Sequence, residues 1–179
     1  MTAIQLTRRS PENVSNRSIE DCPVVTLTEQ EFKIAWHIAA ARTISYEGVS
    51  DEPFGSQDRF EAHLTGVCGE MAVAKAADEE MDDRIYVRGD AGHDLPIAGY
   101  DADVKATATH ISEPDLIVPA DREPSAELFI LAHRIEERKV RLVGWADQTT
   151  LTNRDPERKP GSTLNYIVPF NDLEPIPTK

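Results

Sequence analysis

Cysteine and basic residues are scarce in this sequence, and each scarcity excludes a class of protein. The two cysteines, Cys22 and Cys68, show no zinc-ligand spacing, so we expect both to be reduced and structural. The 19 Lys and Arg residues are outnumbered by 32 Asp and Glu residues, which gives a formal net charge of -13. That balance argues against nucleic-acid binding by general basicity. Any polyanion must therefore meet a local basic surface or metal ions.

Long apolar runs are also lacking. No stretch approaches the roughly 20 residues that a membrane-spanning helix needs, and the N-terminal residues lack the apolar core of a signal peptide. We therefore expect a cytoplasmic protein with no membrane partner. The acidic excess, with lysine scarcer than arginine, is compatible with a halophilic source, where high salt would screen repulsion from a phosphate backbone.

The length of 179 residues corresponds to about one domain with a core of its own. Residues 1–24 are polar and are predicted to form a flexible tail, with local positive charge from Arg8, Arg9 and Arg17. Residues 25–179 are predicted to form a single domain of mixed α/β class, with helices first and strands after them.

Two helices are predicted in the first half of the chain. The first begins at Thr28, where Thr-Glu-Gln-Glu matches a capping box between Thr28 and Glu31, and it ends near Gly48. The second runs from about Ser56 to Asp82 and carries an apolar stripe at alternating steps of four and three residues. The stripe consists of Phe60, Leu64, Val67, Met71 and Ala74.

Glu70 lies beside this stripe, in a segment with few bulky side chains. The run from 66 to 74 reads Gly-Val-Cys-Gly-Glu-Met-Ala-Val-Ala. Small residues allow a helix to lie close to a sheet, which would bring Glu70 near whatever the sheet presents. The alternative is a helix carboxylate that points to solvent.

The pattern changes to that of strands from about residue 84. A hairpin is predicted between a strand at Asp94 and a strand over 100–107, with a turn around Gly99 and Tyr100. Later strands are predicted near 116–118, 127–133, 140–145 and 166–170, and an earlier one at 85–87.

Carboxylates gather on this hairpin. Residues two apart on a strand point to the same face, so Asp101, Asp103 and Lys105 project together, with Asp94 on the preceding strand. We expect Asp101 to face solvent. A divalent cation is the simplest compensation for like charges in a small volume. The alternative is an exposed strand face with solvated ion pairs of little energetic value.

These elements resemble the PD-(D/E)XK nuclease superfamily over roughly residues 56–150, in the small form found in viruses and mobile elements. If the source is viral, the expected location is the host cytoplasm. Glu70 matches the glutamate of the first helix, Asp94 the first motif aspartate, and Asp103-Val104-Lys105 the (D/E)-x-K triplet. The resemblance implies a restriction-endonuclease-like core, a mixed β-sheet flanked by helices, here with an N-terminal helical extension. The superfamily usually places a helix after its strand meander, and no convincing helix precedes the strand near residue 128.

The implied activity is metal-dependent hydrolysis of phosphodiester bonds in DNA, with RNA as a second substrate class, using Mg²⁺ or Mn²⁺. Lys105 would orient the attacking water or stabilise charge in the transition state, and a homodimer is a further possibility. The implied residues are Glu70, Asp94, Asp103 and Lys105 for catalysis, Asp94, Asp103, Val104 and Glu70 for the metal, and Thr107 and His93 for the substrate.

A non-catalytic alternative stays open. Folds outlast their chemistry, and a nuclease fold can serve as a nucleic-acid-binding or assembly scaffold. The complete set of three carboxylates and Lys105 favours the enzyme, because a scaffold gains nothing from their mutual repulsion. The low basicity of the chain favours the scaffold.

Overall fold

A curled five-stranded sheet forms the centre of the molecule, with strand order β1-β6-β5-β3-β2. The computed structural model describes residues 17–45, 59–81, 94–108, 110, 112–159 and 161–176. The predicted mixed α/β class is confirmed. The strands of the central sheet are β1 (Val24–Thr26), β2 (Leu95–Ile97), β3 (Tyr100–Thr107), β5 (Leu128–Glu136) and β6 (Lys139–Asp147).

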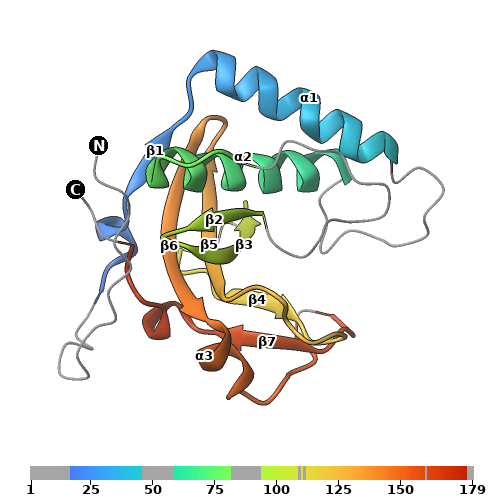
Figure 1. The fold of residues 1–179 in the computed structure, drawn as a ribbon, viewed down its shortest axis with the longest axis vertical. Helices are drawn as coiled ribbons and strands as arrows, with labels where there is room; N and C mark the ends of the chain where they lie inside the picture. The colour runs from blue at the N-terminus through green and yellow to red at the C-terminus, as the bar shows by residue number, and fades with distance from the viewer. Residues whose placement is uncertain are drawn as a thin grey trace.

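Helices cover one face of this sheet and a second, smaller sheet covers the other. Figure 1 shows α1 (Glu29–Ser45) and α2 (Arg59–Ala77) lying together above the central strands. Below the strands lie α3 (Gln148–Thr152) and a two-stranded sheet of β4 (Leu116–Pro119) and β7 (Asn165–Val168). The middle strands β5 and β6 are therefore buried on both faces over most of their length.

The sheet is mixed because β3 and β5 run parallel while the other pairs are antiparallel. Parallel neighbours need a crossover connection, usually a helix. The described part of this crossover contains β4 and no helix. The connection therefore supplies a strand to the second sheet where the resemblance would have placed a helix.

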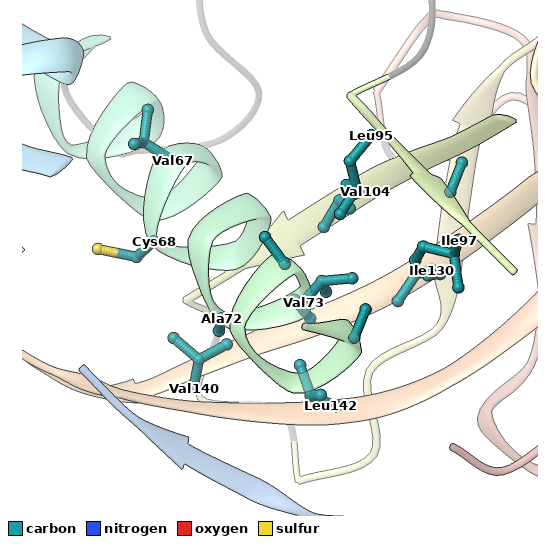
Figure 2. Packing of buried hydrophobic residues seen from close by; sticks show 14 of the residues in the cluster. Val67, Cys68, Ala72, Val73, Leu95, Ile97, Val104, Ile130, Val140 and Leu142 are labelled. Carbon is teal, nitrogen blue, oxygen red and sulfur yellow. The ribbon is translucent and has the colours of Figure 1, made fainter. Parts of the chain in front are cut away.

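Two apolar clusters fill the space on either side of the sheet. Alternation along β5 assigns Ile130 to the cluster under α2, and Phe129 and Leu131 to the cluster facing β4 and β7. Figure 2 shows Val67, Cys68, Ala72 and Val73 of α2 over side chains from β2, β3, β5 and β6. Cys22 and Cys68 are both free and buried.

The helix ends follow local capping chemistry. At the start of α1, the Glu31 amide donates to the Thr28 hydroxyl at 3.2 Å and the Thr28 amide to the Glu31 carboxylate at 2.6 Å, which confirms the capping box. At the end of α2, Asp78 has a φ of 61° and the amide of Glu79 donates to the carbonyl of Ala74 at 3.0 Å. This Schellman-type end stops α2 at Ala77, so the predicted end at Asp82 was wrong.

The hairpin of β2 and β3 turns through Ala98 and Gly99, whose φ angles are 52° and 87°. Two consecutive positive φ values define a two-residue type I′ turn, which matches the twist of the flanking strands. The predicted hairpin is thus confirmed, with its turn one residue earlier than expected. The predicted strand at 85–87 lies outside the described residues.

The described part of the expected flexible tail, residues 17–24, is packed against the sheet. It contains a short 3₁₀ helix over Ile19–Asp21 and the start of β1, and Ile19 and Cys22 are buried. An Arg17 guanidinium nitrogen donates to the Val143 carbonyl oxygen. Within the described ranges, no helix is both long and apolar enough to cross a membrane.

Candidate active site

Helix α2 approaches β3 most closely at Gly69. A Cβ atom at this position would lie 2.7 Å from the Cβ of Ala106 and 3.3 Å from the Cβ of Ala132. Such distances are too short for any side chain, so the small-residue run allows the close approach that the sequence indicates. The neighbouring Glu70 is consequently only 6% exposed, which rules out a carboxylate pointing to solvent.

Arg42 of α1 is the partner of Glu70. Its two terminal nitrogens lie 2.7 and 2.8 Å from the two carboxylate oxygens of Glu70, a bidentate ion pair at the interface of α1 and α2. Sequence reasoning missed Arg42, because a helical arginine 28 positions before a glutamate carries no local signal. The available indication was general: a buried carboxylate requires a cationic partner.

Asp94 lies just before β2, which is the edge strand of the sheet. Its backbone amide donates to the Ala102 carbonyl at 2.8 Å, and its carboxylate accepts the backbone amide of Val104 at 2.6 Å. Since β2 pairs with β3 only as far as Ala102, the Asp94 side chain satisfies a β3 amide beyond the end of the ladder. Asp94 is thereby fixed directly beside the (D/E)-x-K triplet.

The electrostatic environment of Asp94 is strongly unfavourable to its charged form. Burial, followed by the negative charges of Glu70 and Asp103, raises the pKa of the Asp94 carboxyl from 3.8 to about 8. The hydrogen bond from Val104 and the charge of Lys105 oppose this rise but do not cancel it. Among the described residues no lysine or arginine forms an ion pair with Asp94.

Asp103 and Lys105 form a partly buried ion pair on β3, with a nitrogen–oxygen distance of 2.7 Å. The Asp103 side chain is 16% exposed and the Lys105 side chain 34%, so the interpretation as fully solvated pairs does not describe this strand face. Asp101 is exposed, as expected, and Thr107 is partly buried. Val104 points the other way, into the cluster under α2.

The structure thus brings Glu70, Asp94, Asp103 and Lys105 to one edge of the sheet. Glu70 lies on the α2 side of the sheet, and Asp103 and Lys105 project from the opposite face. Asp94 lies at the edge, where the negative charges of both Glu70 and Asp103 raise its pKa. Within the described residues, no three His, Cys, Asp or Glu side chains are grouped to hold a metal ion. His93 lies outside the described residues.

The comparisons with known proteins add no relative: no family model matches this sequence, and searches of curated proteins and of solved structures found no match.

Proposed function

We propose that this protein is a metal-dependent nuclease that hydrolyses phosphodiester bonds in DNA. The observation that carries the proposal is Asp94, a carboxyl held between two other carboxylates without an ion-pair partner among the described residues. Such an arrangement costs folding free energy unless a cation or a proton compensates it.

The donor chemistry fits a hard divalent cation. Asp94, Asp103, Glu70 and the backbone carbonyl of Val104 offer only oxygen ligands, which Mg²⁺ and Mn²⁺ prefer. Mg²⁺ usually binds one or two protein carboxylates and keeps several waters, so a cluster of three ligands is not required. In this structure Glu70 is engaged by Arg42 and Asp103 by Lys105, which leaves Asp94 as the primary ligand.

The side chains of the candidate site would have different roles in phosphodiester hydrolysis. When bound, a divalent cation supplies Lewis-acid polarisation of the scissile phosphate and makes hydroxide available near neutral pH. The water oxygen attacks phosphorus, the phosphorus–oxygen ester bond breaks, and the leaving oxygen takes up a proton. Lys105, held by Asp103, orients the water or stabilises charge in the transition state. Val104 holds Asp94 through its amide.

The test is cleavage of single-stranded DNA, double-stranded DNA and RNA with Mg²⁺ or Mn²⁺, at low and molar salt. We expect Asp103→Ala and Lys105→Ala to lower the rate by about 100-fold or more, since each removes a group acting on the transition state. Asp101→Ala is the matched control, because Asp101 lies two residues before Asp103 on the same strand but is exposed. It should cleave like the parent.

The scaffold alternative is favoured by one observation: two of the three carboxylates already have cationic partners, Arg42 and Lys105. It predicts no cleavage at any salt concentration. If calorimetry also finds no metal binding that depends on Asp103, the catalytic proposal is wrong and the scaffold takes its place.

A further inference from the structure

A hollow of about 230 Å³ opens next to the end of β3, outside the carboxylate site. Its wall begins at Ala108, directly after Thr107, and continues through residues of the crossover, of β5 and of β6. The polar residues that line it are His110, Ser112, His133, Arg134, Arg141 and Glu20. In a chain with a net charge of -13, a hollow with the Arg141 guanidinium, two histidines and a serine is a local exception.

Strand register connects this hollow to the proposed catalytic strand. Thr107 of β3 lies opposite His133 of β5, and His133 lies opposite Arg141 of β6. Lys105 and Thr107 share a strand face and lie about 7 Å apart along β3. A polar row therefore leads from the Asp103–Lys105 pair through Thr107 and His133 to Arg141.

Arg141 is the best-placed group for an anion. The Nε–H of its guanidinium is buried and has no acceptor among the residues that the structure describes. A buried donor without an acceptor costs free energy, and an anionic acceptor relieves that cost most effectively. One terminal nitrogen contacts Glu20 at 3.1 Å, but Glu20 is highly exposed and can swing into solvent.

Arg134 follows His133 on β5, so although the residue borders the hollow, its side chain projects from the other face of the sheet, toward α2. Its guanidinium lies 3.2 Å from Glu61 and reaches Thr65 at 3.5 Å, contacts that hold it from the α2 side. His133 lies between Thr107 and Arg141 in the strand register and is only 6% exposed. The hollow thus combines the guanidinium group of Arg141 with hydrogen-bonding groups of His110, Ser112 and His133, a composition that suits a phosphate.

We propose that this hollow is a phosphate subsite, which binds a backbone phosphate of the nucleic acid strand one or more nucleotides away from the bond that is cut. The inference rests on the proposed nuclease function and adds to it the element that an acidic nuclease needs, a local basic contact for the substrate backbone. Arg141 is its principal residue, and Glu20 is a competing anion at its mouth.

Binding is measured without divalent metal, in EDTA, so that cleavage plays no part. The probes are inorganic phosphate, followed by calorimetry, and a fluorescein-labelled single-stranded oligothymidylate, followed by anisotropy at low salt. We expect Arg141→Gln to weaken binding of both probes by about tenfold to 100-fold, the effect of losing a charge-assisted hydrogen bond. Glu20→Gln should strengthen binding, because it removes the competing charge.

Arg154→Gln is a closely matched control. Arg154 also has a buried Nε without an acceptor among the described residues and an ion pair to a surface carboxylate, Asp172, but it does not line the hollow. It should bind both probes like the parent. If Arg141→Gln proves unstable by thermal melting, the opposite shift in Glu20→Gln still tests the subsite.

Equal binding by the Arg141, Arg154 and Glu20 variants would overturn the subsite. Phosphate binding that depends on Arg141 while the oligonucleotide binds equally to all variants would assign the hollow to free phosphate and also overturn it. Cleavage that depends on Asp103 can survive either result. Conversely, Arg141-dependent binding of both probes without any cleavage would support the phosphate subsite and contradict the proposed nuclease activity.

Discussion

The three acidic residues of the candidate site differ in how their charge is compensated. Glu70 is paired with Arg42 and Asp103 with Lys105, whereas among the described residues Asp94 has no ion-pair partner and accepts the backbone amide of Val104. Local geometry therefore leaves the excess negative charge on one residue. Burial of the Asp94 carboxyl, followed by the negative charges of Glu70 and Asp103, accordingly raises its pKa.

This imbalance predicts a pH-dependent stability at Asp94 in protein without metal. A folded-state pKa of about 8, above the ordinary value of 3.8, means that the folded state binds the proton more tightly. The resulting stabilisation is complete below pH 4 and is lost as the pH rises toward 8. We expect the melting temperature in EDTA to fall by about 2–4 °C per pH unit between pH 5 and 8 relative to Asp94→Asn.

Asn is the appropriate replacement because its side-chain oxygen can still accept the Val104 amide. Asp101→Asn serves as the control, since Asp101 is exposed, and its melting curve should shift with pH like that of the parent. Added Mg²⁺ should stabilise the parent at pH 8 and leave Asp94→Asn unchanged, because a ligand stabilises only the state it binds. Parallel pH profiles for parent and Asp94→Asn would contradict the assignment.

At the scale of elements, the position of Glu70 depends on how closely α2 lies on the sheet. Gly69→Ala places a Cβ 2.7 Å from the Cβ of Ala106, which cannot move without shifting β3. We expect overpacking of this kind to lower the free energy of unfolding by about 1–3 kcal/mol, measured by urea denaturation. The same shift should lower any Asp103-dependent cleavage.

Gly66→Ala, one helical turn earlier, is the control for this substitution. Among the described residues, the atom nearest to a Cβ there is a Glu70 carboxylate oxygen at 3.9 Å. Alanine favours a helix over glycine by up to about 1 kcal/mol, so this variant should be as stable as the parent or more stable. Equal losses at both positions would contradict the assignment, because helix propensity favours alanine at both and the close contact with β3 exists only at Gly69.

Local sequence signals predicted the elements correctly where short-range chemistry decides them. A few consecutive residues determine each of three features: the capping box at Thr28, the small-residue run around Glu70 and the hairpin at Gly99. The partner of Glu70 was not predictable in this way, because Arg42 meets it only after two helices pack. The ordered segment 17–24 was missed for the same reason: its burial depends on β6, more than 100 residues later.

The hollow at the end of β3 is likewise a product of tertiary structure. Thr107, His133 and Arg141 become neighbours through strand register alone. The sequence shows only an acidic chain, and its general composition argues against nucleic-acid binding. The fold places the Arg141 guanidinium beside His133 in this hollow, and a local contact of this kind is how an acidic protein can meet a polyanion.

For the whole molecule, a net charge of -13 predicts that self-repulsion limits stability at low salt. Raising the ionic strength shortens the screening length from about 10 Å at 0.1 M to about 3 Å at 1 M. Repulsion between distant surface carboxylates is thereby removed, whereas the short, partly buried contacts of Arg42 with Glu70 and of Lys105 with Asp103 are screened much less. We expect the melting temperature at pH 7 to rise by about 5 °C between 0.02 and 1 M NaCl.

The control for this salt effect is the pH and not a variant. Near the isoelectric point of about 4.7 the net charge vanishes, so the same NaCl series should then leave the melting temperature almost unchanged. A rise of equal size at both pH values would indicate salting-out of apolar surface and not relief of charge repulsion. A fall at pH 7 would mean that attractive surface ion pairs outweigh self-repulsion, in which case high salt would weaken the fold as well as its contacts with a phosphate backbone.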